Sequence, residues 1–499
     1  MKNKLFGVLL FIETAALLLS ALVAGHYHAL TGETDLKAFL LSAAITGVVG
    51  LSFYLIGSRS KKKLGMKDTF LVVALSWVLF SCFGMLPFLL YGAVDNVTDA
   101  FFETMSGFTT TGSTILTNID DMPHGILFWR SIMQWLGGLG IVVFTLAFIP
   151  SVAKGSRKMT LFAAEAPGLS VEKLAPTMQG TARILWIIYI LLTGLCAICY
   201  RIGPMNTFDA ICHAFTTIAT GGFSTHQESI GYYHSNYLEY VCAGFMILSG
   251  INFAMYYFFV ARRFDVLKKN EELKVYLCSI ILLTLLFIGL FYVAPSIAGG
   301  TENQYASYPS GREDTFRTSL FHVSTMLSNT GFIGQNFNYD MWGMLFVIPT
   351  LLMLIVGGCA GSTSGGIKII RVIVLFKFIK NALKELIHPT GMFSVKISGQ
   401  TVDEFSVQRV CHFFTMFIIL MVLNVIALTA TGLDMGDATI SFMTCFSNLG
   451  IGSGATGPTA SFSDLPAASK WILSFDMLIG RLEILTIALL FTPAFWRTK

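Results

Sequence analysis

Charged residues are scarce in this chain. Only 12% of its 499 residues are Asp, Glu, Lys or Arg, whereas 54% are hydrophobic and the mean hydropathy is +0.69. A soluble globular domain carries about 25% charged residues. Half that proportion, together with long apolar runs such as Ala15–Ala24, excludes a water-soluble protein and indicates a polytopic membrane protein.

Cysteine patterns and catalytic constellations are also missing. The nine cysteines are odd in number, scattered, and mostly inside apolar segments, which argues against a disulfide framework. Cys196 and Cys199 form a C-x-x-C pair in the middle of an apolar stretch, so we interpret them as small packing residues. Because no nucleophile–base pair or metal-ligand cluster is recognisable, we predict that the protein is not an enzyme and carries no covalent cofactor.

What the sequence does contain is a series of apolar windows long enough to cross a bilayer. They lie at residues 5–25, 37–57, 68–92, 124–149, 183–203, 238–261, 275–294, 341–381, 406–431 and 471–496. The first is longer than a signal-peptide core and contains Glu13, so we interpret it as a retained span. Ten spans place both termini on the same side of the membrane.

Lysine and arginine are distributed asymmetrically between the connections. Nearly all of them lie at the two termini and in the connections Ser58–Asp68, Ser151–Arg183, Ala261–Lys274 and Lys368–Arg409. The opposite connections contain only Lys37, Arg201, Arg312, Arg317 and Lys470. The positive-inside rule therefore predicts a multi-pass protein of a cytoplasmic membrane with both termini in the cytoplasm.

Four of the outward connections repeat one pattern. Each contains an apolar stretch too short to cross the membrane, followed by a turn of small residues. The stretches run over residues 99–112, 209–222, 318–331 and 437–450. Each begins with a residue able to cap a helix, thirteen positions before a glycine, and the four glycines recur at intervals of 110, 109 and 119 residues. This long period indicates internal duplication.

The repeat predicts an all-α integral membrane fold. We expect four pseudo-symmetric span–pore helix–span repeats around one central pore, preceded by two extra transmembrane helices. The predicted boundaries are 1–60 for the two-helix extension, then 61–160, 161–265, 266–395 and 396–499 for the four pore repeats.

The segment that follows each short helix cannot return through lipid as an extended chain, because backbone polar groups at membrane depth must form hydrogen bonds or line a water-filled path. The carboxyl ends of the short helices would point at the centre with the negative pole of the helix dipole, and glycine allows close approach of the backbone. A ring of carbonyl oxygens that replaces a hydration shell is how potassium filters work. We therefore predict a filter that binds K⁺ at Thr110, Thr111, Gly112, Thr220, Gly221, Gly222, Asn329, Thr330, Gly331, Asn448, Leu449 and Gly450. The alternative, four glycine turns without conduction, leaves the regular spacing unexplained.

The chain resembles a known family over essentially its whole length. The resemblance rests on Ser106-Gly-Phe-Thr-Thr-Thr-Gly112, Thr217-Ile-Ala-Thr-Gly-Gly-Phe-Ser-Thr-His226, Gly357-Gly-Cys-Ala-Gly-Ser-Thr-Ser-Gly-Gly366 and Gly480-Arg-Leu-Glu-Ile484. These segments resemble those of the TrkH-type subunits of bacterial potassium uptake systems, in the superfamily that includes KtrB and the plant HKT transporters. The two extra spans also resemble the TrkH branch.

The resemblance implies potassium uptake, a homodimer and a cytosolic nucleotide-binding ring, TrkA, with nucleotide bound only to that separate subunit. Relatives with serine at the first filter glycine tend toward Na⁺, so Gly112 implies K⁺. Asn329 and Asn448 depart from the family's threonine-rich pattern in loops three and four. The basic segment Lys368–Arg409 is either a docking surface for the ring or simply the positive-inside signal.

A glycine-rich segment interrupts what would otherwise be one long helix at residues 341–381. The interruption begins about sixteen residues, or roughly 24 Å, from the outer end, which places it beneath the filter. We predict an intramembrane gate formed by Gly357, Gly358, Gly361, Gly365 and Gly366, as the resemblance also implies. A phosphate-binding loop is the rival interpretation, but the order of residues is wrong for that motif.

Three of the charged residues in the predicted membrane segments lie near the predicted filter or gate. We expect Arg481 to contact the glycine-rich segment and to place a positive barrier below the filter; a pairing that only fixes helix packing is the alternative. Glu103 either adds negative charge near the filter or forms hydrogen bonds behind it, and Arg130 is expected to snorkel or to pair.

The composite prediction is a channel-like subunit for potassium uptake. The alternative is a symporter that couples K⁺ to H⁺ or Na⁺, which would favour acidic residues deep in broken helices. A membrane scaffold without transport is disfavoured by the four pore repeats.

Overall fold

The computed structural model describes residues 2–59, 65–138, 140, 177–297, 308–336, 342, 344–457 and 461–497. Within these ranges the chain is helical, with one antiparallel hairpin of β1 (Lys396–Ile397) and β2 (Gln400–Thr401). The predicted all-α class is therefore observed. The second half of the window 124–149, and most of the basic connection Ser151–Arg183 with the boundary at residue 160, lie outside the described residues.

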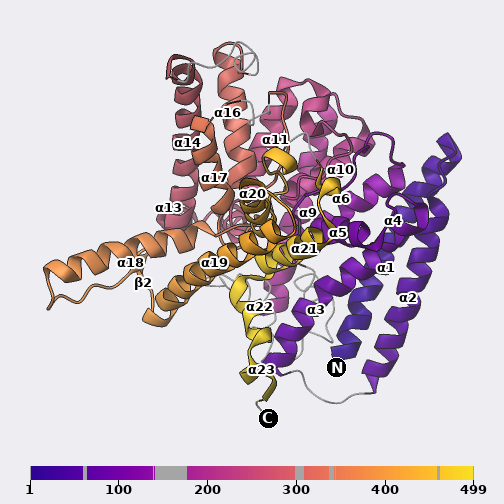
Figure 1. Cartoon of the computed structure of the whole chain (residues 1–499), viewed down its shortest axis with the longest axis horizontal. Coiled ribbons are helices and arrows are strands. Elements are labelled where there is room, and N and C mark those ends of the chain that lie inside the picture. The colour runs from indigo at the N-terminus through magenta and orange to yellow at the C-terminus, as the bar shows by residue number, and fades with distance from the viewer. Residues whose placement is uncertain are drawn as a thin grey trace.

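The N-terminal extension is an antiparallel pair, α1 (Lys2–Thr31) and α2 (Leu36–Ser58) (Figure 1). Glycine lets the two backbones touch. A Cβ added at Gly7 would lie 2.5 Å from the amide nitrogen of Tyr54 and 2.6 Å from the carbonyl oxygen of Gly50. Small residues at such crossings are the usual basis of helix packing in lipid.

Four helices that match the predicted short stretches, α5, α10, α16 and α20, follow in order along the chain, each within a group of other helices. The first group is α3 (Met66–Gly84), α4 (Leu86–Tyr91), α5 (Val97–Phe108) and α6 (His124–Gly138). The second is α9 (Met178–Ile202), α10 (Thr207–Ile218), η1 (Ser229–Tyr233), α11 (Asn236–Ser249) and α12 (Phe253–Val260). The third is α13 (Phe264–Lys269), α14 (Glu271–Ile297), α16 (Arg312–Leu327), α17 (Met344–Ile355) and α18 (Ile369–Ile387). The fourth is α19 (Glu404–Ala430), α20 (Met435–Phe446), η3 (Gly454–Thr456), η4 (Phe462–Asp464), α21 (Ala467–Leu482), α22 (Ile484–Phe491) and α23 (Pro493–Arg497).

The short helices α5, α10, α16 and α20 begin earlier than predicted. Asn96 and Asn206 are the true N-caps of α5 and α10, since their side chains accept hydrogen bonds from the amides of Asp99 and Asp209. Asp434 caps α20, and Thr318 lies well inside α16. The predicted caps were wrong because Asp99 and Asp209 occupy the third helical position, where a carboxylate is also favourable.

Several predicted spans are not continuous helices. Among the described residues, six helices are long and apolar enough to cross a membrane, or seven if the bent pair α11 and α12 is one span. That pair bends by 94°, so the window 238–261 is not a straight helix. The window 471–496 breaks at Glu483, whose φ is +67°, and α18 leaves the bundle instead of continuing α17 (Figure 1).

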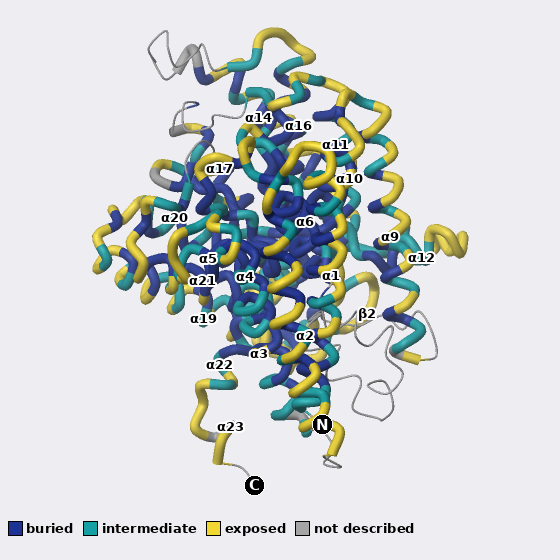
Figure 2. The backbone as a smooth tube through the Cα atoms, turned by 90° about the vertical axis from the view of Figure 1, so that its right-hand side faces the viewer, coloured by how far each residue is buried: buried dark blue, intermediate teal, exposed yellow. Residues whose placement is uncertain are grey.

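Burial separates the centre of the molecule from its periphery. The short helices and α6 are largely buried, whereas α1, α2 and α19 carry exposed residues along their lengths (Figure 2). The exposed residues of the outer helices include large apolar side chains such as Leu191, Leu282 and Ile426. An apolar periphery of this extent suits lipid and not water. Both termini lie at the same end of the bundle.

The close crossing of α1 and α2 generates a stability prediction. Gly7→Ala places a methyl group against the backbone of α2, and we expect it to lower the free energy of unfolding by about 1–3 kcal/mol. The thermal midpoint of the detergent-solubilised protein measures the effect. Gly194→Ala is the matched control, because Gly194 also lies inside a helix but faces open space. Equal midpoints for the two variants would contradict the packing argument.

Candidate functional site

The structure brings the four predicted loops together in a closed ring. Each glycine faces the carbonyl oxygen of the residue that precedes the glycine of the next loop. A Cβ added at Gly112 would lie 2.2 Å from the carbonyl oxygen of Gly221, and a Cβ added at Gly222 would lie 2.1 Å from the carbonyl oxygen of Thr330. The same distance is 1.9 Å from Gly331 to the oxygen of Leu449 and 2.4 Å from Gly450 to the oxygen of Thr111. The sequence of contacts runs from loop one through loop four and back to loop one. A side chain at any of these glycines would collide with a neighbouring backbone.

The four loops share one backbone conformation although their side chains differ. The residue two positions before each glycine is left-handed, with φ of +57° at Thr110, +53° at Thr220, +56° at Asn329 and +52° at Asn448. The glycines themselves have φ between +76° and +87°. Left-handed residues other than glycine are uncommon, and such strain gathers at functional sites.

Identical hydrogen bonds form the start of each loop. The amide after the left-handed residue donates to the carbonyl five positions earlier. These bonds are Thr111 to Ser106 (2.9 Å), Gly221 to Thr216 (2.9 Å), Thr330 to Thr325 (3.0 Å) and Leu449 to Thr444 (3.1 Å). This is the Schellman ending of a helix, repeated four times. The short helices therefore run directly into the ring, with their carboxyl ends toward it.

The four glycines line one cavity on the ring. Gly112, Gly222, Gly331 and Gly450 contribute to it together with residues of the segments that follow the loops, among them Ser224, His226 and Phe462. The four loops therefore share one open space on the side of the ring where the segments that follow the loops lie.

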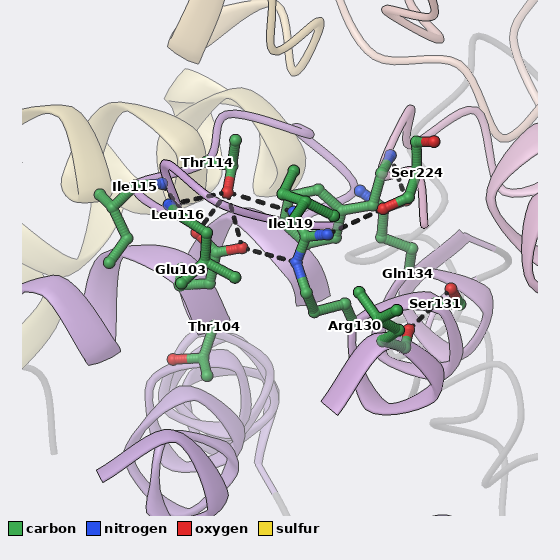
Figure 3. A network of polar contacts seen from close by, with 12 residues as sticks. Glu103, Thr104, Thr114, Ile115, Leu116, Ile119, Arg130, Ser131, Gln134 and Ser224 are labelled. Carbon is green, nitrogen blue, oxygen red and sulfur yellow. Dashed lines mark hydrogen bonds and ion pairs between the residues drawn. The ribbon is translucent and has the colours of Figure 1, made fainter. Parts of the chain in front are cut away.

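Buried polar residues hold the first two loops from behind. The Arg130 guanidinium of α6 donates to Glu103 of α5 (2.9 Å) and to the carbonyl oxygen of Ser224 (2.9 Å), and all three are buried (Figure 3). Glu103 also accepts hydrogen bonds from the Thr114 hydroxyl and the Ile115 amide. Of the two interpretations left open for Glu103, the structure places it in hydrogen bonds behind the loop, and Arg130 pairs with it.

Gln134 is a supporting residue that the sequence reasoning missed. Its side-chain amide donates to the carbonyl oxygen of Gly221 (2.7 Å) and accepts from the amide of Phe223 (3.1 Å), so it holds the second loop on both sides of Gly222. A lone glutamine inside an apolar helix is the signal that could have identified it.

Side chains inside the loops have unequal roles. Thr220 belongs to the predicted filter, and its hydroxyl donates to the carbonyl oxygen of Ala219 (2.7 Å). The Thr110 hydroxyl is buried and has no hydrogen-bond partner in the described structure. Asn448 donates to the Thr111 hydroxyl (2.9 Å), which joins loop four to loop one.

The glycine-rich segment Gly357–Gly366 lies directly against loops three and four. The Ser364 hydroxyl donates to the Asn329 side chain (3.0 Å), and a Cβ at Gly365 would lie 2.1 Å from the carbonyl oxygen of Ser447. The segment also closes on itself, because the Gly357 amide donates to Ile367 (3.0 Å) and the Gly358 amide to Ser364 (2.8 Å). Gly361 and Gly366 have left-handed φ values of +76° and +64°.

Arg481 joins this segment to the carboxyl end of α6. Its guanidinium donates to the carbonyl oxygen of Thr363 (3.0 Å) and to those of Gly137 (2.6 Å) and Gly138 (2.5 Å). The structure thus brings Arg481 to the segment, as expected. Glu483 instead forms an ion pair with Arg371 of α18.

No group of three or more His, Cys, Asp or Glu side chains that could hold a metal ion is found in the described ranges. The predicted potassium ligands are backbone carbonyl oxygens, which belong to a different class of donors.

Comparison with known proteins gives one consistent family. Residues 36–498 match the family model TrkH, described as a cation transport protein. The Trk system potassium uptake protein TrkH of Escherichia coli (strain K12) is 35% identical over 501 residues, covering 99% of both chains. The protein of the same name from Halomonas elongata is 38% identical over 466 residues, covering 92% of each chain.

Comparison with a solved structure indicates the same family. The crystal structure of the potassium transporter TrkH from Vibrio parahaemolyticus superposes with a TM-score of 0.83 and 31% identity, covering 99% of this chain and 100% of that one. These relatives are named as potassium uptake and transport proteins, and they are not enzymes. The chain belongs to the TrkH family of cation transport proteins.

Proposed function

We propose that this protein takes up potassium through a pore whose selectivity filter is the ring of four glycine loops. The single observation that carries the proposal is the closed cycle of contacts from Gly112 through Gly222 and Gly331 to Gly450, together with the cavity that all four line. The relatives are named as Trk system potassium uptake proteins, which supports the choice of ion.

Main-chain oxygen supplies the proposed ion ligands. Residues of alternating φ sign turn successive carbonyl groups toward one side of the chain, whereas an extended strand points them to alternate sides. Four short helices direct the negative poles of their dipoles toward the same centre, which favours a cation there. Carbonyls at fixed positions can then replace the hydration shell of K⁺.

The two asparagines that depart from the family pattern support the loops and need not contact the ion. Asn448 donates to Thr111 and to the carbonyl oxygen of Met477 (3.1 Å), and Asn329 accepts from Ser364. Selectivity in the proposed filter therefore depends on the shared backbone and not on these side chains.

The segment Gly357–Gly366 is the proposed gate. It packs beneath loops three and four and is tied by Arg481 to the carbonyl oxygens at the end of α6. In this arrangement it obstructs the inner mouth of the proposed pore, and conduction requires it to move. The guanidinium adds a positive charge on the same path, which opposes a cation.

A coupled transporter is the second candidate, and two buried acids favour it. Glu13 in α1 and Asp476 in α21 are fully buried; among the described residues the Glu13 carboxyl group has no hydrogen-bond partner, and the Asn424 side chain lies beside Asp476. Buried acids of this kind mark proton or ion pathways in coupled carriers. Potassium flux into proteoliposomes under a K⁺ gradient alone distinguishes the two functions, since a strictly coupled carrier would give none.

The remaining assignments are proposals that rest on the distribution of lysine and arginine and on family resemblance. We place both termini in the cytoplasm, consistent with their common position at one end of the bundle. We also propose a homodimer that binds a cytosolic TrkA-type ring near the basic segment Lys368–Arg409.

Gly112→Ser tests the filter. The new Cβ would meet the carbonyl oxygen of Gly221 at a left-handed position, so loop one must shift. We expect the preference for K⁺ over Na⁺ in a proteoliposome flux assay to fall about tenfold, equivalent to about 1.4 kcal/mol. Gly244→Ser, at a glycine that faces open space on α11, is the control. Unchanged ion preference in Gly112→Ser would rule out this ring as the filter.

Arg481→Ala tests the gate. It removes three hydrogen bonds from a charged donor, each worth about 1.5–3 kcal/mol in general. We expect the potassium leak of the purified protein, without any regulatory subunit, to rise at least several-fold. Arg201→Ala, on the exposed end of α9, serves as the control and is expected to leave the leak unchanged. A leak equal to that of the unsubstituted protein would argue that Arg481 only fixes helix packing.

A further inference from the structure

A histidine beside the ring has a carboxylate on each side. His226 lies four residues after Gly222, with its Nδ1 atom 2.7 Å from Asp120 Oδ1 and its Nε2 atom 3.3 Å from Asp209 Oδ2. Ionised carboxylates only accept hydrogen bonds, and a neutral imidazole donates from only one nitrogen. The geometry therefore fits the doubly protonated, positively charged ring.

The two carboxylates come from different parts of the pore. Asp120 lies in the segment between loop one and α6, and Asp209 lies in the first turn of α10. The His226 ring stacks on Tyr232 of η1, with centroids 3.7 Å apart and an angle of 8°. His226 thus joins the segments that follow loops one and two to the start of the second short helix.

This contact is coupled closely to the ring of loops. His226 lines the same cavity as the four glycines. Its backbone amide donates to the Ser224 hydroxyl (3.0 Å), and the carbonyl of Ser224 accepts from Arg130. Between Ser224 and Gly222 there is only Phe223, whose ring stacks against the Arg130 guanidinium at 4.1 Å. A displacement of His226 would be transmitted to Gly222 over a few bonds.

We propose that protonated His226 is a positioning residue that fastens the segments beyond loops one and two, so that protons of the outer solution set how tightly the pore binds K⁺. The inference rests on the proposed filter function. It adds a regulation to that site and does not make His226 an ion ligand.

The charged surroundings of His226 favour the proton. Facing it are Asp120, Asp209, Tyr232, Tyr233 and His213, with the Arg130–Glu103 pair behind Ser224. Burial lowers the pKa of His226, but hydrogen bonds and attraction from Asp209 and Asp120 outweigh it and raise the pKa above its usual 6.5. The stabilisation that protonated His226 gives through its two carboxylates is complete below pH 6.5, and it is lost as the pH rises through the raised pKa of His226.

Potassium uptake into proteoliposomes, with the inner pH fixed and the outer pH varied, measures the effect. From about pH 6 to about pH 9 we expect the apparent affinity for K⁺ to weaken roughly tenfold, the loss of one charge-assisted hydrogen bond. The His226→Gln variant should bind K⁺ with the weaker apparent affinity at every pH, and this affinity should not change with the outer pH. His226→Arg, which keeps the charge, should retain the tighter affinity at alkaline pH.

His124→Gln is the matched control. His124 is also a histidine outside the predicted cytoplasmic segments with its Nδ1 atom on a carboxylate, Glu33 at 2.7 Å, but it does not line the cavity. We expect this variant to keep the pH profile of the unsubstituted protein. If His226→Gln also keeps that profile, or if affinity rises with pH, the proposal is overturned.

A second measurement separates this proposal from the filter itself. Histidine NMR of the protein in nanodiscs, with the His226 signal assigned by His226→Gln, reports the protonation of the ring without any flux. A titration above pH 6.5 that moves to lower pH in Asp120→Asn supports the bridge, and a titration at or below 6.5 overturns it. If His226 titrates above pH 6.5 but the protein shows no preference for K⁺, the proposed filter is contradicted and the bridge from His226 to Asp120 and Asp209 is retained.

Discussion

A peptide group that leaves a helix inside a membrane must find a partner or water, because an unsatisfied one costs several kcal/mol in hydrocarbon. The four loops meet this requirement collectively. Each is closed at its start by the same Schellman hydrogen bonds, and each glycine admits the carbonyl of the next loop. None of the loops could keep this conformation alone, so the long peripheral helices serve to hold four half-helices at one centre.

The buried charges follow from the same requirement. Arg130 and Glu103 neutralise each other between the first two loops, and the guanidinium also donates to the Ser224 carbonyl oxygen and the Thr114 hydroxyl. Breaking a buried pair of this kind is expensive, whereas the intact pair adds little stability over apolar residues. The pair therefore serves to fix the position of the first two loops relative to each other. Gln134 holds Gly221 in place through a hydrogen bond from its neutral amide.

Local spacing in the sequence predicted the loops, because a cap, a short apolar stretch and a glycine are neighbours in the chain. The all-α class and the family were predicted correctly on this basis, and Arg481 reaches the glycine-rich segment as expected. Features that depend on distant contacts were missed. Apolar windows cannot reveal the 94° bend between α11 and α12 or the break at Glu483, whose carboxylate pairs with Arg371 far along the chain. Three of the four caps were misplaced by three residues, as at α5, where Asn96 and Asp99 both carry suitable oxygens.

The difference between the loops reflects what lies beneath each of them. Under loop one and loop two lie the glycines of α6, where a Cβ at Gly137 would meet the carbonyl oxygen of Phe108, and one at Gly138 would meet Ala219. Gly480 of α21 lies under loop four in the same way, but loops three and four also rest on the segment Gly357–Gly366, and here asparagine replaces threonine. An asparagine side chain reaches further than a threonine hydroxyl and can bond outside its own loop. In the proposed mechanism, movement of the gate therefore breaks the Ser364–Asn329 hydrogen bond, so that opening the inner mouth also loosens the third loop of the filter.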